Sequence, residues 1–336
     1  MLLKYRPAKT EDLPECLSKL RNRFAYTEPQ QRALLDLWQS FHRLGSVNFA
    51  IVEDADAPPG DRILTFSFKV FVPESEVDAI IRHNEPSIGH YFLREMAKGN
   101  APILNLPALQ TANSSSGVDM VLMSYGTASQ FRDPVHPARM SPGSPDWFLY
   151  SMGGYRLNFI LFEVYDRCDW VWTEGFGGRL YRDQNQDFQI DETGHEIRQD
   201  SAPRVSGSGM AALAPRPRLY GMPRPDDLRL MGTLAGYIFG DTLPRFEFTA
   251  AQQQLLLHAL FGATDEELAI DLGIAKVSVK KRWAAIYERV RDIAPDVLPA
   301  HLSTDDGSSR IAQKRRRLIG YIRHHMEELR PYEKRA

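Results

Sequence analysis

Helix-start and helix-stop residues are most regularly spaced in residues 248–290, and they constrain the fold of this chain more than any other feature. Thr249 is followed three residues later by Gln252, and Thr264 by Glu267 in the same way. A Thr followed at that interval by Glu or Gln forms a capping box, in which each side chain binds the other residue's backbone amide. Glycine ends helices well because it adopts left-handed backbone angles, and Gly262 and Gly273 stand where the first two helices should end. This spacing predicts a helix, then a very short helix, a glycine turn and a longer helix from about Lys276 to Val290, which is a helix-turn-helix arrangement.

The predicted third helix has one apolar stripe and one cationic side. Val279, Trp283, Ile286 and Val290 recur at intervals of three and four residues, which indicates a buried face. Cations near the start of a helix suit entry into the major groove, because they neutralise phosphates while the helix start approaches base edges. The alternative is an ordinary helical bundle whose lysines form a solvated face. The residues predicted to bind DNA are Thr264, Lys276, Ser278, Lys280, Lys281 and Arg282, to which the resemblance described next adds Val279.

The stretch Phe248 to Val290 resembles the LuxR-type (NarL/FixJ-like) DNA-binding domain. The elements that match are the Phe-Thr opening, TDEELAIDLGI in the helix-turn-helix core and VSVKKRWAAIYERV in the recognition helix. The resemblance implies DNA contacts from Ser278, Val279, Lys280 and Lys281, and a homodimer on paired half-sites. The sequence departs from the family at Ala275, where a capping Ser or Thr is usual. A module similar to region four of sigma factors is the alternative within DNA binding.

Residues 1–190 show strand and helix patterns in alternation. Strand-like runs cover residues 2–6, 46–54, 62–73 and 117–126, and helical patterns cover about residues 13–24 and 30–44. The run YRLNFILFEVYD, Tyr155 to Asp166, has apolar residues at helical spacing. The fold class expected is mixed α/β and α+β: an N-terminal mixed-sheet domain and an all-α helix-turn-helix domain.

Domain boundaries follow from a change in composition. Residues 191–227 are rich in Pro, Gly, Ser and Arg without a sustained apolar period, which is typical of a linker. We therefore expect a sensor or regulatory domain over 1–190, a linker over 191–227 and the DNA-binding domain over 228–336. Within the last of these, apolar residues from Leu318 to Leu329 recur at helical spacing and predict a C-terminal helix.

The N-terminal domain resembles the GNAT acyltransferase fold. The resemblance is carried by KYRPAKTEDLPE at the first strand-to-helix junction, and by GGYRLNFILFEVYD followed by TEGFGGRLYRD, which are similar to the acyl-CoA-binding helix and the terminal turn of that fold. A phosphate-binding loop presents backbone amides at a helix start. Gly153 and Gly154 alone stand at the corresponding place in the sequence, so acyl-CoA binding is left open.

Composition and cysteine spacing limit the partners, metal sites and cellular locations that we expect for this chain. The net charge of −2 does not indicate a polyanionic partner for the whole chain, and the two cysteines show no metal-ligand or disulfide spacing. The start lacks the apolar segment of a signal peptide, which favours a cytoplasmic protein without a membrane span. No cofactor, metal site or catalytic residue is indicated.

These patterns lead to one main expectation and one alternative. The main expectation is a DNA-binding transcriptional regulator, not an enzyme, whose N-terminal domain senses a small-molecule effector or binds a partner protein. The alternative is a GNAT-like acyltransferase with an appended DNA-binding domain.

Overall fold

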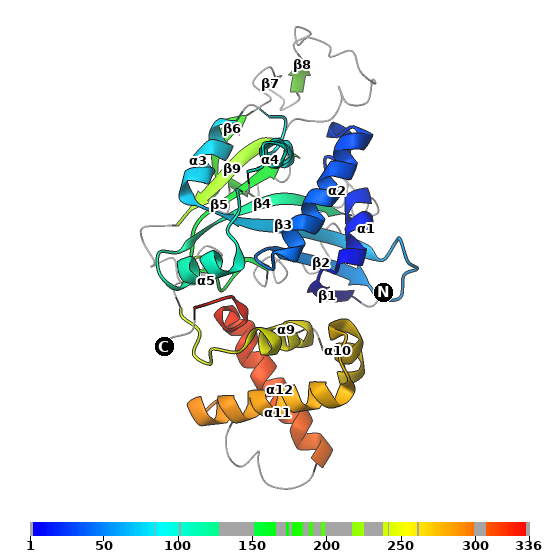
Figure 1. Cartoon of the computed structure of the whole chain (residues 1–336), viewed down its shortest axis with the longest axis vertical. Helices are drawn as coiled ribbons and strands as arrows, with labels where there is room; N and C mark the ends of the chain where they lie inside the picture. Colours follow the sequence, from blue (N-terminus) through cyan, green and yellow to red (C-terminus); the bar gives the residue numbers. More distant parts are fainter. Residues whose placement is uncertain are drawn as a thin grey trace.

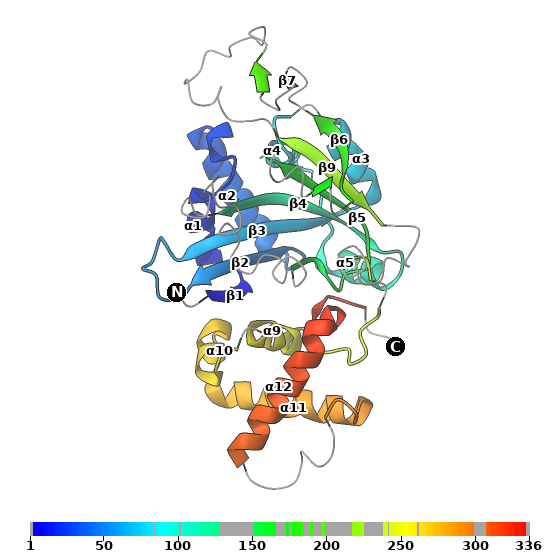
Figure 2. The same ribbon diagram turned by 180° about the vertical axis from the view of Figure 1, so that it is seen from behind.

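A seven-stranded sheet flanked by helices forms the larger part of the chain, and a separate group of helices follows it (Figure 1, Figure 2). This computed structural model describes residues 3–83, 85–100, 102–127, 151–165, 173–174, 177–183, 188–190, 196–198, 217–224, 238–240, 242–260, 262–298 and 307–333. The strands are β1 Leu3–Pro7, β2 Asn48–Asp54, β3 Ile63–Val72, β4 Val118–Thr127, β5 Leu157–Val164, β6 Arg179–Asp183, β7 Phe188–Ile190, β8 Glu196–Arg198 and β9 Arg218–Pro223. The helices are α1 Leu13–Ser18, α2 Glu28–Arg43, α3 Glu74–Arg82, α4 Ile88–Ala97, α5 Leu106–Ser114, α9 Ala250–Ala259, α10 Asp265–Leu272, α11 Lys276–Ile293 and α12 Gly307–His324, with short 3₁₀ turns η1 Thr10–Asp12, η2 Arg23–Ala25 and η8 Met326–Leu329.

The strand order in the sheet is β1-β2-β3-β4-β5-β9-β6, and β7 and β8 form a separate hairpin. Every neighbouring pair in the large sheet is antiparallel except β4 and β5, which run parallel. Pairing between these two strands extends from Val118 opposite Leu157 to Leu122 opposite Phe162. β4 then continues to Thr127 beside β3, and β5 continues to Val164 beside β9. The two parallel strands therefore separate at their carboxyl ends.

The two faces of the sheet are buried against different helices. Trp38 of α2 lies in the largest core, 5.9 Å from the ring of Phe49 and 5.7 Å from that of Phe66, with α1, α3 and α4 contributing to the same cluster. On the opposite face, Leu109 of α5 packs in a second cluster with Met120 of β4. The expected mixed-sheet domain is thus confirmed, with most of its sheet covered on both sides.

The run Tyr155 to Asp166 was predicted to be helical, and this prediction is wrong because Leu157–Val164 forms strand β5. The strand lies between β4 and β9, and most of its residues are buried. A strand covered on both faces is apolar at nearly every position, so it also satisfies the helical spacing of three and four residues. Its content of Phe, Ile and Val, which favours strands, indicates the observed structure better than the spacing of its apolar residues does.

The sheet extends beyond the predicted domain boundary at residue 190. Residues 218–223, within the predicted linker 191–227, form β9 and pair with both β5 and β6. Tyr220 in this strand is fully buried. A strand inserted between two others cannot be a linker, so the sheet domain includes residues up to at least Pro223. Residues 199–216 lie outside the described part of the chain.

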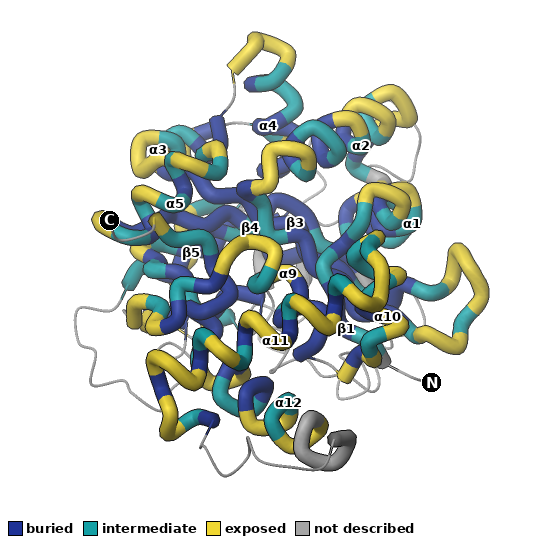
Figure 3. Tube along the Cα trace, turned by 60° about the horizontal axis from the view of Figure 1, so that its bottom comes forward, coloured by how far each residue is buried: buried dark blue, intermediate teal, exposed yellow. Residues whose placement is uncertain are grey.

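The first two C-terminal helices begin and end where the sequence predicts, and α11 begins at the predicted Lys276 but extends to Ile293. The helix expected over Leu318 to Leu329 is α12, which starts earlier and ends at His324, before the 3₁₀ turn η8. Capping boxes at Thr249 and Thr264 start α9 and α10, and Gly273 ends α10 with a left-handed φ of 62°. α11 starts at Lys276 after Ala275, which provides no side-chain cap. Figure 3 shows α11 with alternating buried and exposed positions. Its stripe Val279, Trp283, Ile286 and Val290 is buried in one core with α9, α10 and α12. Among the described residues, no helix has the length and apolarity needed to cross a membrane.

This C-terminal helical unit, residues 242–333, contacts the sheet domain at β1 and at a second region made by the segment before β5 and the end of α5, where Asn113 donates to the Pro331 carbonyl at 3.0 Å. Lys4 of β1 donates to the Asp271 carboxylate of α10 at 2.9 Å, and the Lys9 amine lies 3.4 Å from the same carboxylate. At the other contact the Arg330 side chain donates to the Gly153 carbonyl at 2.8 Å and stacks over the Tyr155 ring at 4.6 Å. The two parts are therefore joined by buried or half-buried polar contacts.

Candidate active site

The residues predicted to bind DNA lie on α11, apart from Thr264, which caps α10, and the structure does not expose all of them. Val279 is fully buried, so its assignment as a contact residue is wrong: it belongs to the apolar stripe. Thr264 is occupied as the cap of α10, where its hydroxyl accepts from the Glu267 amide, and Lys276 pairs with Glu266. Lys280 and Lys281 are exposed, whereas Ser278 and Arg282 are half-buried.

Gly153 and Gly154, the pair compared with a phosphate-binding loop, are covered by the C-terminal segment. The Gly153 carbonyl accepts from Arg330. A Cβ on Gly154, whose φ is +84°, would stand 2.3 Å from the Met326 carbonyl carbon and 2.4 Å from the Glu327 nitrogen. Both glycines precede β5 and so lie at its amino end, whereas the two parallel strands separate at their carboxyl ends. The pair therefore fits a packing role and not a phosphate site.

A buried carboxyl group stands where the parallel strands separate. Glu163 follows directly after the last β5 residue that pairs with β4, and it is only 4% exposed. Its Oε1 accepts from the backbone amide of Ile88 at 2.8 Å, at the first residue of α4. Its Oε2 accepts from the Tyr165 hydroxyl at 2.7 Å. The first turn of α4 thus fixes one oxygen, which is the end of a helix that favours a negative charge.

Beside this carboxyl, Ser87, Tyr26 and His90 form a chain of hydrogen bonds. Ser87 caps α4, and its hydroxyl lies 2.8 Å from the Tyr26 hydroxyl and 2.8 Å from His90 Nδ1. The Tyr26 and His90 rings stack at 4.1 Å. Gly89 permits this approach, because a Cβ there would stand 2.2 Å from the Tyr26 hydroxyl oxygen. The His90 ring also forms a hydrogen bond with the Ala25 backbone.

Burial controls the protonation of this cluster. It raises the pKa of Glu163 from 4.5 to about 7, against the opposing effect of the Tyr165 hydroxyl and the Ile88 amide. It lowers the pKa of His90, which keeps this ring neutral, and it raises the pKa of Tyr26 and of Tyr165 above the ordinary range. A carboxyl with a pKa close to neutral pH exchanges protons readily, which is the property of a general base.

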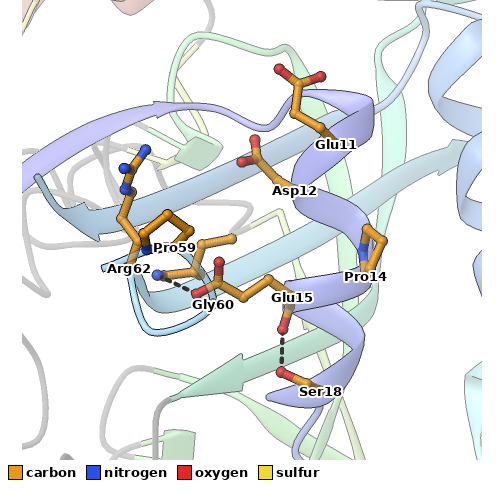
Figure 4. Close-up of a pocket in the computed structure, with 9 residues that line it drawn as sticks. Glu11, Asp12, Pro14, Glu15, Ser18, Pro59, Gly60 and Arg62 are labelled. Carbon is orange, nitrogen blue, oxygen red and sulfur yellow. Dashed lines mark hydrogen bonds between the residues drawn. The ribbon is translucent and has the colours of Figure 1, made fainter. Parts of the chain in front are cut away.

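The hollow drawn in Figure 4 lies elsewhere, between α1 and the turn that joins β2 to β3. Two of its three acidic side chains are already engaged: Glu15 accepts from the Ile63 amide at 2.7 Å and pairs with Lys19, while Asp12 pairs with Arg6. None of the residues that line it belongs to the cluster around Glu163. Within the described residues, no group of three or more His, Cys, Asp or Glu side chains is placed to hold a metal ion.

Sequence reasoning did not find the Glu163 cluster. Its members come from three separate regions: Tyr26 precedes α2, Ser87 and His90 belong to the start of α4, and Glu163 is the next-to-last residue of β5. The Ser87 cap three residues before His90 is a local helix-start signal, but it carries no indication of chemistry. Only the sheet topology brings these groups together.

The comparisons with known proteins identify no family for this chain. No protein-family model matches the chain, and no curated protein sequence matches it. One similar solved structure is the C-terminal condensation domain of Ebony in complex with beta-alanyl-dopamine, with 12% identity, 66% of this chain and 100% of that chain covered, and a TM-score of 0.37. Another is a mutant of agmatine N-acetyltransferase in its apo form, with 10% identity, 66% and 100% coverage and a TM-score of 0.33. A mosquito arylalkylamine N-acetyltransferase-like protein, 5b, has 11% identity, 66% and 99% coverage and a TM-score of 0.34. At these identities the likeness concerns the fold alone.

These findings correct the main functional expectation. The prediction of a LuxR-type DNA-binding transcription regulator that is not an enzyme is wrong, because the similar structures are two acetyltransferase proteins and a condensation domain. The predictions that residues of α10 and α11 contact duplex DNA and that the chain is a homodimer are not tested by any of these findings.

Proposed function

We propose that the sheet domain is an acyltransferase that moves an acyl group from a thioester to an amine, with Glu163 as the general base. The observation that carries this proposal is the position of one buried carboxyl, with a pKa of about 7, beside the point where the parallel strands β4 and β5 stop pairing. Ligands of open sheets bind at such points, because the carboxyl ends of diverging strands leave backbone groups without a neighbouring strand.

The chemistry requires a base of this strength. An amine attacks the thioester carbonyl carbon through its nitrogen lone pair, so a C–N bond forms, the C–S bond breaks, and the nitrogen must lose a proton. Glu163 in its ionised form takes that proton, and the departing thiolate takes a proton from solvent to become a thiol. A carboxylate with a pKa near 7 is a stronger base than an ordinary one yet is still ionised in a large share of molecules at neutral pH.

The hydrogen-bonded neighbours of Glu163 serve as positioning residues. The Ile88 amide and the Tyr165 hydroxyl hold one oxygen each, which fixes the plane of the carboxyl group. Ser87 caps α4 and thereby fixes the position of the Ile88 amide. Fixed geometry matters because a base must lie within hydrogen-bond reach of the proton it removes.

An acyl-coenzyme A is the thioester donor that the fold suggests. Coenzyme A supplies the thioester when it is bound, and its carrier arm contains amide groups that pair with an open strand edge. The residues suited to hold this arm are those of β4 beyond Leu122, where β5 no longer pairs. Gly153 and Gly154 do not fit its phosphates, because the C-terminal segment covers them.

For the C-terminal unit we propose a helix-turn-helix fold without attaching a role in nucleic-acid binding. Support comes from the two-turn α10, the left-handed Gly273 and the long α11 that packs on it. Its contacts with β1 and with the segment before β5 make it a support for one side of the sheet.

The test is steady-state kinetics of the whole chain with acetyl-CoA and a panel of primary amines, measured as released thiol. Glu163→Gln should lower kcat/KM by about 100-fold or more, the usual contribution of a general base. The wild-type pH profile of kcat/KM should rise through about pH 7, as the carboxyl ionises, and the variant should lose that rise. Asp36→Asn, at an exposed position of α2, is the matched control and should keep the wild-type profile.

Glutamine preserves the local contacts, since its carbonyl can accept from Ile88 and its amide can donate to the Tyr165 oxygen. A loss of activity would therefore report the missing base and not a displaced helix. Equal kcat/KM and equal pH profiles for Glu163→Gln and wild type would overturn the assignment of the base. No thiol release with any amine, together with no binding of acetyl-CoA, would overturn the proposed function.

A further inference from the structure

The chain itself occupies part of the strand edge that β5 leaves open. Residues 19–22, between α1 and η2, are called the strap here. Leu20 forms an isolated antiparallel bridge with Gly126, and the Arg21 amide donates to the Tyr125 carbonyl at 3.0 Å. β3 holds the other edge of β4, where Ser67 pairs with Tyr125 and Phe66 with Gly126. The strap therefore lies along the edge of β4 that faces β5, just beyond the last β4–β5 pair.

The fit between strap and strand is close and depends on a glycine. A Cβ on Gly126 would stand 2.0 Å from the Lys19 carbonyl oxygen and 2.6 Å from its carbonyl carbon, so only glycine permits this approach. Leu20 is 3% exposed and belongs to the main core. The Lys19 amine donates to Glu15 at 2.7 Å and to the Gly60 carbonyl at 3.0 Å, which ties the start of the strap to α1 and the β2–β3 turn.

The strap is also connected to the hydrogen-bond chain beside Glu163. Asn22, its last residue, is buried, and its side chain contacts the Tyr26 hydroxyl. That hydroxyl bonds to Ser87, which caps α4 beneath Glu163. A displacement of the strap would thus break its hydrogen bond to β4 and also its contact with the residues that position the base.

We propose that the strap is a built-in competitor of the acyl donor, an inference that rests on the proposed function. An extended arm that adds to β4 beyond Leu122 needs the Tyr125 carbonyl, which the Arg21 amide already occupies. Donor binding must therefore release Leu20 and Arg21 from β4. The apparent affinity for the donor is reduced by the fraction of molecules in which the strap is in place. Displacement also moves Asn22 away from Tyr26, which couples donor binding to the hydrogen bonds that position the Glu163 carboxyl.

The experiment measures the dissociation constant of acetyl-CoA by calorimetry on the full chain. Arg21→Pro removes the amide hydrogen that bonds to Tyr125 and should tighten binding by about fivefold, the effect of losing one backbone hydrogen bond from the strap. Arg21→Ala keeps that amide, and its affinity should stay within about twofold of wild type. In wild type, hydrogen exchange of a peptide covering residues 19–22 should accelerate when acetyl-CoA is added, which tests displacement without any substitution.

The outcomes separate the two proposals. Binding of acetyl-CoA with equal affinity to wild type, Arg21→Pro and Arg21→Ala, without faster exchange in residues 19–22, would overturn the strap and leave the acyltransferase standing. Binding to Arg21→Pro alone would support the strap in its strongest form. Absence of binding to all three proteins would overturn both, since removal of the amide should open the edge to the donor.

Discussion

At the scale of single residues, two carboxyl groups are buried at positions where the loss of solvation disfavours their ionised form. Glu163 and Glu328 are both buried, and burial raises the pKa of each to about 7. Glu328 accepts from the backbone amides of Arg245 and Phe246 at 2.8 and 3.0 Å, which gives it an evident structural purpose in the C-terminal unit. Glu163 likewise has a partner on each oxygen, the Ile88 amide and the Tyr165 hydroxyl. The two carboxyl groups differ in place, because Glu163 alone of the two stands where the parallel strands β4 and β5 stop pairing.

The raised pKa of Glu163 predicts how stability depends on pH. Between about pH 4.5 and pH 7 the folded chain keeps a proton on this carboxyl that the unfolded chain has lost, so stability falls as pH rises through that window. The fall attributable to Glu163 is on the order of 3 kcal/mol. Urea unfolding at about pH 5 and pH 8 should show a smaller fall for Glu163→Gln than for wild type. Glu328 and Asp119, whose pKa values burial raises to about 7 and about 6, add to the fall, whereas the lowered pKa values of His83 and His90 oppose it. Glu328→Gln should therefore also make the fall smaller. Equal falls in wild type and Glu163→Gln would contradict a protonated carboxyl.

No property of residue 163 in the sequence distinguishes it from a surface glutamate. Its run, FILFEVY, gives no sign that the carboxyl is buried, because burial depends on β9 and α4, which are distant in the chain. The lysines of α11, in contrast, form an obvious cluster in the sequence. Local charge density is visible in a sequence, whereas the environment that shifts a pKa is created by tertiary contacts.

At the scale of elements, structure followed the sequence wherever local chemistry decides it. The starts of α9 and α10 and the end of α10 are fixed by Thr and Gly residues that act on their own backbone, so these were predicted correctly. β5 and β9 were missed because their positions depend on partners. β5 is apolar on both faces, and β9 lies at the end of a Pro- and Arg-rich segment that resembles a linker. Residues 218–223 form a strand because they pair with β5 on one side and with β6 on the other.

α11 offers a test at this scale, since it is a long helix whose N-cap residue provides no side-chain cap. Ala275 precedes it in an extended conformation, with φ −66° and ψ 145°, which is the geometry of a capping residue. Ala275→Ser should supply the missing acceptor for an amide of the first turn and raise the free energy of unfolding by about 1 kcal/mol. Ala284→Ser, at an exposed position inside the same helix, is the control and should lower stability by a few tenths of a kcal/mol, about the difference in helix propensity. Both are measured by urea unfolding, and a loss of stability in Ala275→Ser would show that the cap geometry is not reached.

At the scale of the whole molecule, two parts with separate cores meet through polar contacts. The C-terminal unit reaches β1 through Asp271 and the start of β5 through Arg330. The second contact also involves Gly154, whose backbone lies against Met326 and Glu327. The unit therefore supports the amino end of β5, and Glu163 lies near the other end of that strand. Weakening this contact tests how much the C-terminal helices contribute to the stability of the sheet domain.

Substituting Gly154 should separate the two parts. In Gly154→Ala the Cβ meets backbone atoms of Met326 and Glu327 at 2.3 to 2.6 Å, in addition to the strain of a φ of +84°. We expect a loss of about 3 kcal/mol or more in the free energy of unfolding, because backbone atoms cannot rotate away as a side chain can. Gly99→Ala, with a φ of +80° and open space around its Cβ, isolates the strain and should lose only about 1 kcal/mol. Hydrogen exchange across residues 326–333 should rise in Gly154→Ala and stay unchanged in Gly99→Ala. Equal losses of stability in the two variants, with the exchange of residues 326–333 unchanged, would mean that the contact with η8 contributes nothing to holding the C-terminal unit on the sheet.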